Sequence, residues 1–131
     1  MTSARRLGAE DTLEIQAVLQ RYAFALDDRD WDAMREVFTD DAEWLGAVGL
    51  DGVIHELQVH THPYQHVIAN HLMEAVSDDE VIVRSKALFP VAEGRVLEAV
   101  YRDVVVRTPA GWKIRHKSAT RYDPELGATN R

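Results

Sequence analysis

The chain has 131 residues, which is the length of one domain and enough to bury a hydrophobic core without disulfide bonds. It contains no cysteine, which excludes a thiolate nucleophile and a zinc–sulfur site and fits a reducing cytoplasm. The net charge is −7, and an acidic surface repels phosphate backbones, so we expect no nucleic-acid partner. No apolar run reaches the roughly 18–20 residues that span a bilayer, and the N-terminal segment lacks a signal-peptide core. We therefore expect a cytoplasmic protein with no membrane partner.

The first part of the chain has the periodicity of a helix. Residues 1–10 show no pattern and are predicted to be a flexible tail. A helix is predicted from Asp11, because Glu14 three residues later resembles a capping box. It is expected to end within residues 27–29. The apolar residues that share its buried face are Ile15, Val18, Leu19, Tyr22 and Leu26.

Two shorter helices are predicted next. Asp30 can cap the first of them, and residues 39–41 break it before a short strand over residues 42–45. The second opens at residues 51–52 and is stopped by Pro63. The predicted buried residues of these two helices are Trp31, Met34, Val37, Phe38, Val53, Ile54 and Leu57.

From residue 64 onward the chain is rich in valine and isoleucine, as strands are. Four strands are predicted over residues 64–76, 80–91, 95–108 and 111–120. The turns between them are short, which requires antiparallel neighbours. Helices followed by a strand meander are typical of the α+β class. We therefore predict one domain over residues 11–122, with three helices packed on a curved antiparallel sheet, and a C-terminal tail over residues 123–131.

The alternation of side chains along these strands places polar residues among apolar ones. On the first strand His66 and Asn70 share a side, and on the third Asp103 lies among apolar neighbours. On the last strand His116 shares a side with two apolar residues and opposes Lys117. The apolar side of a half-exposed sheet faces the helices. His66, Asn70, Asp103 and His116 are therefore predicted to point inward, and Lys117 outward.

Two segments carry a family resemblance: residues 20–31, with the sequence QRYAFALDDRDW, and residues 37–44, with VFTDDAEW. They resemble the opening of the nuclear transport factor 2-like superfamily and, within it, the SnoaL-like group. The wider set includes scytalone dehydratase, ketosteroid isomerase, polyketide cyclases and hexachlorocyclohexane dehydrochlorinase. The resemblance covers about residues 11–120. It implies that the helices and the sheet close around a cone-shaped apolar pocket.

The resemblance implies roles for individual residues. In the dehydratase and the dehydrochlorinase, an aspartate that ends the first helix partners a histidine on the first long strand, and Asp27 and His66 match these positions. Asn70 resembles the dehydrochlorinase pattern. In ketosteroid isomerase, a tyrosine on the first helix and a protonated aspartic acid on the third long strand form an oxyanion hole, and Tyr22 and Asp103 match them.

Other family residues have no counterpart. Val91 stands where the dehydratase has a second active-site histidine, and Gly46 stands near the catalytic base of the isomerase. The arginine of the dehydrochlorinase falls near Lys117, a cation of different geometry. An epoxide hydrolase of the limonene type needs an Asp–Arg–Asp set that the chain does not offer. No single family activity therefore transfers whole.

A histidine beside an aspartate is suited to proton transfer, because the carboxylate fixes the tautomer of the ring and stabilises the imidazolium. We expect His66 to be the general base and Asp27 its partner, with no cofactor. Trp44, Phe89 and His116 are expected to line the pocket, although a histidine in the place of His116 is more often packed or at a dimer interface.

Two other predicted contacts also have alternatives that the sequence leaves open. Tyr22 lies on the buried face of its helix, so core packing explains it as well as catalysis does. Asp103 follows Arg102 and is equally consistent with an interface salt bridge.

A cluster of five histidines raises the question of a metal site. The histidines are His55, His60, His62, His66 and His71. They include no His-Glu-x-x-His motif, and on a strand the last two face opposite sides. We therefore expect no metal and a polar segment over the pocket mouth.

These observations together predict a cofactor-independent lyase, isomerase or cyclase. Its substrate is expected to be a small hydrophobic molecule such as a polyketide, terpenoid, steroid or aromatic compound. The alternative is a non-catalytic ligand-binding protein or accessory subunit of the same fold, which a filled pocket or a solvent-facing Asp27 would favour. The outer face of the sheet, with Val100, Val104 and Val106, is apolar enough to pack on a second copy, so we expect a homodimer or a trimer.

Overall fold

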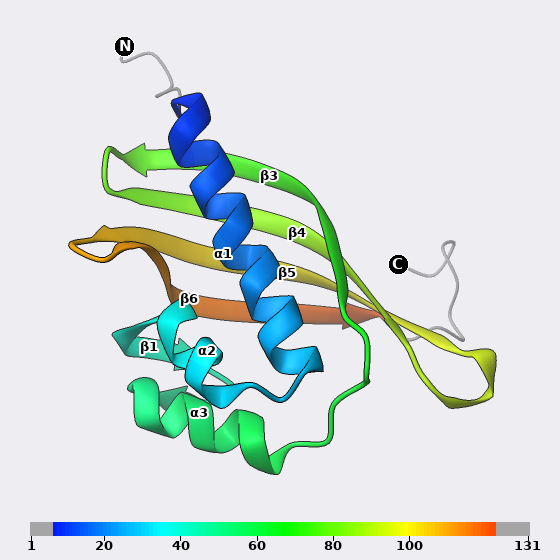
Figure 1. Ribbon diagram of the computed structural model, residues 1–131. Helices are drawn as coiled ribbons and strands as arrows, with labels where there is room; N and C mark the ends of the chain where they lie inside the picture. The colour runs from blue at the N-terminus through cyan, green and yellow to red at the C-terminus, as the bar shows by residue number, and fades with distance from the viewer. Residues whose placement is uncertain (1–6, 123–131) are drawn as a thin grey trace.

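The computed structural model describes residues 7–122, so the predicted tails lie largely outside the described residues (Figure 1). Three helices come early in the chain, as predicted: α1 (Ala9–Asp27), α2 (Trp31–Val37) and α3 (Leu50–Val59). The strands are β1 (Phe38–Trp44), β2 (Ala47–Val48), β3 (Val67–Ser77), β4 (Glu80–Pro90), β5 (Val96–Thr108) and β6 (Gly111–Tyr122), with a short 3-10 turn, η1 (Ala92–Gly94), between β4 and β5. The α+β class is therefore confirmed.

The sheet has six strands in the order β2-β1-β6-β5-β4-β3, and it curves without closing. Its long strands pair antiparallel as predicted, but β1 runs parallel to β6, so the sheet is mixed. The difference arises because α2 ends at Val37 and the chain enters β1 at once, with Phe38 opposite Ile114. Residues 39–41, predicted to break the helix, instead continue this strand.

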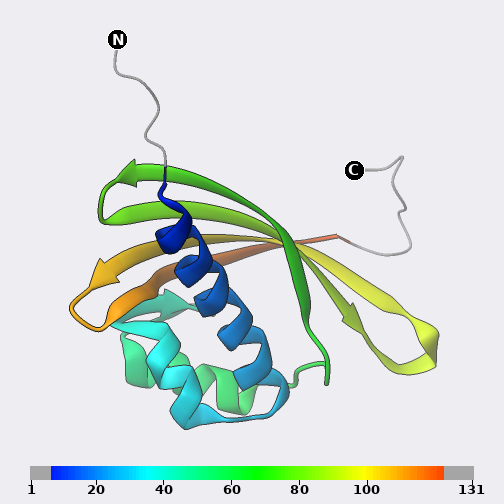
Figure 2. The same ribbon diagram turned by 45° about the horizontal axis from the view of Figure 1, so that its top comes forward.

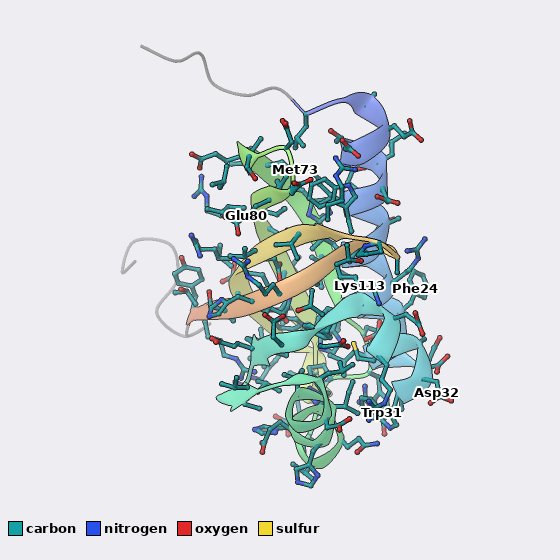
Figure 3. All side chains as sticks on the ribbon, turned by 90° about the vertical axis from the view of Figure 1, so that its left-hand side faces the viewer. Phe24, Trp31, Asp32, Met73, Glu80 and Lys113 are labelled. Atoms are coloured by element: carbon teal, nitrogen blue, oxygen red, sulfur yellow. The ribbon has the colours of Figure 1, made fainter. Side chains whose placement is uncertain are left out.

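Helix α1 crosses the concave face of the sheet, and α2 and α3 extend the helical layer beside it (Figures 1 and 2). The predicted buried faces of α1 and α3 are confirmed. Phe24 lies on the outer side of α1 (Figure 3) and is 71% exposed. The core therefore forms where the buried helix faces meet the concave side of the sheet.

The beginning of α1 differs from the prediction. The helix starts at Ala9, and its cap residue Gly8 provides no side-chain hydrogen bond, so the predicted capping box is wrong. The Asp11 carboxylate instead accepts from Nε1 of Trp112 at 3.1 Å and from the guanidinium of Arg107 at 3.0 and 3.2 Å. Asp11 therefore joins the first turn of α1 to β5 and β6 instead of capping the helix.

Among the register shifts of the sheet, two interrupt the alternation of side chains at the predicted site residues. In β3, Asn70 has a φ of 55° and the register to β4 shifts around it. In β6, the register to β5 shifts beside Arg115. A bulge adds one residue to one strand, so every later side chain changes sides. His71 and Lys117 therefore point inward, contrary to the prediction.

Among residues 7–122, no helix combines the length and the apolar character that a membrane span requires.

The bulge in β3 can be tested by substitution at Asn70. A left-handed φ costs a branched L-residue about 1–2 kcal/mol, whereas glycine adopts it freely. We expect Asn70→Val to lower the free energy of unfolding by about that amount, and Asn70→Gly to leave it unchanged or higher. Urea unfolding of the two variants beside the unmodified protein measures both effects. Equal losses in the two variants would instead assign the effect to the asparagine amide.

Candidate active site at the end of α1

The last turn of α1 directs Asp27 out of the helix. The Asp30 N–H donates to the Ala25 carbonyl at 2.8 Å, and the Arg29 N–H donates to the Leu26 carbonyl at 3.1 Å. With Arg29 at a φ of 55°, these bonds form a Schellman-type helix end. The carboxylate of Asp27, the final residue of α1, is thereby free to meet the segment that leads into β3.

Asp27 binds His66 through both carboxylate oxygens. Its Oδ1 lies 2.5 Å from Nδ1 of the imidazole, and its Oδ2 accepts from the backbone N–H of His66 at 3.1 Å. The side chain of His66 is 3% exposed and that of Asp27 14%. Because a carboxylate only accepts, Nδ1 carries the ring proton and the free lone pair lies on Nε2. The two residues predicted to form a catalytic pair are therefore in contact, with His66 one residue before β3.

The surroundings of His66 favour its neutral form. Burial lowers the pKa of the ring and outweighs the hydrogen bond and charge of Asp27, which raise it. The positive charges of Arg29 and Lys117 lower the pKa further. The ring is therefore neutral near pH 7, which is the form in which Nε2 can take up a proton.

A chain of aromatic rings connects His66 to the middle of the sheet. The Phe89 ring centroid lies 5.0 Å from that of His66, and Tyr101 follows at 6.1 Å from Phe89. Tyr22 and Trp44 pack edge-on against Tyr101. Nε1 of Trp44 donates to the Tyr22 hydroxyl at 3.1 Å. Three predicted pocket residues are thus gathered with His66 around Tyr101, which the sequence analysis did not single out.

Two polar atoms in this aromatic cluster have no hydrogen-bond partner among residues 7–122: Nε2 of His66 and the hydroxyl of Tyr101. In the same range, the only fully enclosed side-chain nitrogen or oxygen without a partner is Nδ1 of His116, so neither of these two atoms is fully enclosed. Burial and the charge of Asp103 raise the pKa of Tyr101, which keeps its hydroxyl protonated. The cluster therefore offers a proton acceptor and a hydrogen-bond donor.

A buried ion pair lies against the same rings. Nζ of Lys117 donates to Oδ1 of Asp103 at 3.0 Å and to Oδ2 at 3.3 Å, and both side chains are 1% exposed. The ammonium also lies 4.2 Å from the ring centroid of Tyr22 and 4.0 Å from that of Tyr101. Burial raises the pKa of Asp103 and lowers that of Lys117, while each charge opposes the shift of the other. Asp103 is therefore occupied by Lys117, which the sequence analysis had placed on the opposite face.

A second buried pair was also missed. Nδ1 of His71 lies 2.7 Å from Oγ of Ser85, and burial lowers the pKa of His71. Ser85 is 0% exposed, so a substrate cannot reach its hydroxyl as a nucleophile. The sequence signal that could have revealed this pair is Asn70, a residue type that tolerates the left-handed conformation of a bulge.

Two predicted pocket residues do not join His66. Asn70 is exposed on the bulge of β3. The side chain of His116 is 41% exposed, and its Nε2 lies 3.6 Å from the Glu43 carboxylate of β1. The prediction that both point inward with His66 is wrong, because it assumed regular strands where β3 and β6 carry bulges.

The histidine-rich segment forms a row of rings. His60 and His62 are 6.3 Å apart between ring centroids, as are His62 and His66. Within the described part of the chain, no three histidine, aspartate or glutamate side chains are grouped as a metal site requires. Nε2 of His62 lies 2.8 Å from the Leu57 carbonyl, which fixes this ring against α3.

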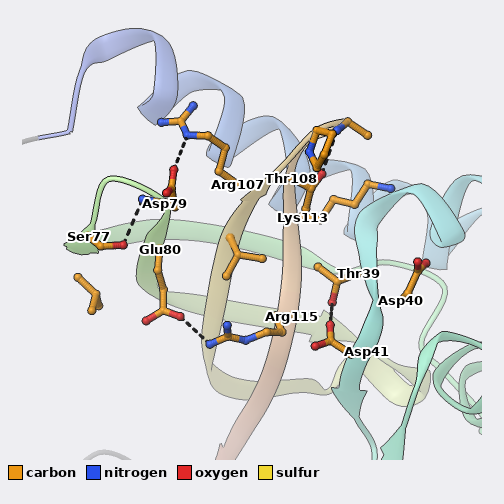
Figure 4. A pocket seen from close by; sticks show the side chains of 14 residues that line it. Thr39, Asp40, Asp41, Ser77, Asp79, Glu80, Arg107, Thr108, Lys113 and Arg115 are labelled. Carbon is orange, nitrogen blue, oxygen red and sulfur yellow. Dashed lines mark hydrogen bonds and ion pairs between the residues drawn. The ribbon is translucent and has the colours of Figure 1, made fainter.

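An open groove of about 880 Å³ lies elsewhere, between β1 and the turns that join β3 to β4 and β5 to β6 (Figure 4). Two of its cations are paired with acids, Arg107 with Asp79 and Arg115 with Glu80. Arg107 also binds Asp11, which precedes Asp27 by 16 residues and about 24 Å along α1. The groove is therefore separate from the Asp27–His66 pair.

Comparison with known proteins identifies relatives at the level of family and fold. The family model described as a SnoaL-like domain matches residues 8–118. An uncharacterised protein of Mycobacterium tuberculosis is 31% identical over 125 residues, covering 85% of each chain. A scytalone dehydratase candidate from Novosphingobium aromaticivorans superimposes with a TM-score of 0.73 at 23% identity, covering 88% of this chain and 89% of the other. A hexachlorocyclohexane dehydrochlorinase of type 2 superimposes with a TM-score of 0.71 at 23% identity, covering 88% and 90%.

The lowered pKa of His66 predicts how stability depends on pH. Below the ordinary histidine value of about 6.5, the unfolded chain binds a proton at residue 66 more readily than the folded protein does. The free energy of unfolding should therefore fall as the pH drops from about 7 to 5, and His66→Gln should reduce the slope by up to about 1.4 kcal/mol per pH unit. Urea unfolding across this range measures both slopes. Identical slopes for the two proteins would contradict the shift.

Proposed function

Since the chain belongs to the SnoaL-like family of the nuclear transport factor 2-like superfamily, we propose that it is a cofactor-independent lyase, isomerase or cyclase that uses His66 as general base. The observation that carries the proposal is the hydrogen bond that Nδ1–H of His66 donates to the Asp27 carboxylate, which leaves Nε2 unprotonated with a free lone pair. The dehydratase and dehydrochlorinase names of two structural neighbours point to the same class of reaction.

The proposed step is removal of a proton from a carbon next to a carbonyl or beside a leaving group. Nε2 takes the proton, the C–H electron pair forms a double bond, and the leaving group departs with its own electron pair. In a dehydration the imidazolium returns this proton to the departing hydroxyl, so water leaves and His66 becomes neutral again. Asp27 stabilises the positive charge that develops on the ring during the step.

Tyr101 is the proposed donor to the substrate oxygen. Its hydroxyl is protonated because burial raises its pKa, and it lies in the same aromatic cluster as His66 without being fully enclosed. A hydrogen bond to a developing enolate strengthens as negative charge accumulates, which lowers the barrier. Tyr22 is a poorer candidate for this role, since it is only 1% exposed and lies deeper in the core than Tyr101.

The proposed substrate is a small, mostly apolar molecule that fits a pocket between the helices and the sheet. Phe89 packs against the His66 ring, Tyr101 packs against Phe89, and Trp44 packs against Tyr101, so the space beside His66 is bordered by aromatic rings. Such a lining favours a polyketide, terpenoid, steroid or aromatic compound with one polar group near the reacting carbon.

The alternative function is a non-catalytic ligand-binding protein or accessory subunit of the same fold. One observation favours it: Phe89 is only 5% exposed and packs against the His66 ring, so this side chain occupies part of the space beside the ring. The contact between Asp27 and His66 favours the enzyme, because a protein that only binds an apolar ligand does not need a base of fixed tautomer.

Replacement of His66 tests the proposed function. General-base catalysis contributes about 100- to 10,000-fold, so His66→Ala should lower kcat at least about 100-fold in a screen of proton-abstraction reactions. Two probes cover the elimination reactions of this class: cyclic β-hydroxy ketones, with dehydration followed by absorbance, and hexachlorocyclohexane, with elimination followed by chloride release. His55→Ala is the matched control, because this histidine is exposed on α3. An active protein whose rate is unaffected by His66→Ala would overturn the mechanism, and ligand binding without turnover by the unmodified protein would favour the binding function.

We further propose that the outer face of the sheet joins two copies of the chain. The bulge in β3 turns Leu72 outward, where it is 62% exposed, and Val76 on the same strand is 48% exposed. Val104, opposite Ile82 in the β4–β5 pairing, continues this apolar surface toward β6. Burial of such a surface in a second copy removes apolar area from water.

Light scattering coupled to size-exclusion chromatography tests the assembly. At micromolar concentration the chain should have twice the mass of one copy, and Val104→Lys should shift it to a single copy. Lys86→Ala is the matched control, since it removes a charge from the same face. A trimer would require a different arrangement, and a monomeric unmodified protein would overturn the proposal.

A further inference from the structure

Arg29 makes hydrogen bonds that the proposed catalytic step does not use. Its guanidinium donates through Nη2 to the carbonyl of His62 at 3.0 Å and to that of Pro63 at 3.3 Å, and through Nη1 to the carbonyl of Leu26. It also lies over the ring of Tyr64, 5.9 Å from the centroid. One side chain therefore bonds the end of α1 to the segment that precedes β3.

This link runs beside the contact between Asp27 and His66. Arg29 follows Asp27 by two residues, and Pro63 precedes His66 by three. The same two segments are thus joined twice, once by the guanidinium and once by the carboxylate. The hydrogen bonds of Arg29 go only to backbone carbonyls. Arg29 therefore constrains the path of the backbone near Asp27 and near His66.

The backbone of Arg29 indicates that the side chain matters at this position. Its φ of 55° lies in the left-handed region, where a helix end ordinarily carries glycine. An arginine there costs conformational energy that glycine would not. The three carbonyl bonds offset that cost, and a planar guanidinium can reach several acceptors at once in a way that a lysine ammonium cannot.

We propose that Arg29 is a positioning residue that holds the segment before β3 in the register that keeps the His66 ring on the Asp27 carboxylate. The inference rests on the proposed function for its effect on turnover, but its structural part concerns the free protein. The charged or titratable groups that act on His66 are Asp27 from α1, Arg29 itself, Lys117 from β6 and His62 from the preceding segment.

Two variants separate the effect of the guanidinium hydrogen bonds from the effects of backbone strain and of positive charge. Arg29→Gly removes the guanidinium but suits the left-handed φ, so a loss of function cannot be ascribed to backbone strain. Arg29→Lys retains the positive charge, and with it the electrostatic effect on His66, but loses the planar fork. Arg35→Gln is the matched control, because Arg35 is a surface arginine that pairs with Asp51 on α3.

The readout in the free protein is the exchange with water of the Nδ1 proton of His66, observed by NMR below the unfolding temperature of each variant. We expect this exchange to become at least about tenfold faster in both Arg29 variants and to stay unchanged in Arg35→Gln. With a substrate in hand, kcat should fall about 10- to 100-fold while KM changes less, since small displacements of a catalytic group cost rate more than binding.

The outcomes distinguish this inference from the proposed function. If His66→Ala abolishes turnover but the Arg29 variants leave proton exchange and kcat unchanged, Arg29 is only a helix cap and the inference is overturned. If the Arg29 variants accelerate the exchange while His66→Ala retains turnover, the positioning role stands and the proposed catalytic role of His66 falls.

Discussion

The site depends on one carboxylate that holds both the ring and the backbone of a residue 39 positions away in the chain. Asp27 ends α1, and His66 stands just before β3, so their contact joins the helical layer to the first long strand. Neither the backbone N–H nor the Nδ1 proton of His66 could be left unpaired in a place this enclosed without a cost of about 1–3 kcal/mol each. The same contact therefore stabilises the junction and selects the tautomer that exposes Nε2.

A second constraint is that the Asp103–Lys117 ion pair and the Asp27–His66 pair are bonded separately. Lys117 is neutralised by Asp103, and its ammonium lies against the faces of Tyr22 and Tyr101, where the ring quadrupoles favour a cation. A buried pair of this kind adds little net stability, but removal of one partner leaves an uncompensated charge. The positive charge of Lys117 lowers the pKa of His66, whereas the negative charge of Asp27 raises it. The imidazole thus stays neutral beside one carboxylate, Asp27, and two cations, Arg29 and Lys117.

Much of this arrangement was predictable from the sequence. The buried face of α1 follows from helical periodicity. The pairing of Asp27 with His66 follows from the family resemblance, because no local sequence pattern connects the two positions. The inward direction of Lys117 and His71 was not predictable, because alternation assumes an uninterrupted strand and a single added residue reverses it. The parallel pairing of β1 with β6 was missed for a related reason: the polar run at residues 39–41 resembles a loop but lies on a strand at one side of the sheet.

Under the proposed mechanism, the residues that assist His66 differ from those that the resemblance implies for the dehydratase and the isomerase. Val91, which resemblance aligns with the second histidine of the dehydratase, lies beyond the end of β4, where its backbone N–H donates to the Arg95 carbonyl in the β4–β5 hairpin. Gly46, near the position of the isomerase base, has no side chain to offer. The proposed mechanism therefore needs a different polar group near the imidazole. The Tyr101 hydroxyl is the one we propose, because Phe89 packs against both Tyr101 and His66. A phenol with a raised pKa does not readily give up its proton, but it still donates a hydrogen bond. Tyr101 in this place therefore favours reactions in which negative charge develops on a substrate oxygen. It is less suited to reactions in which a strongly basic leaving group must be protonated.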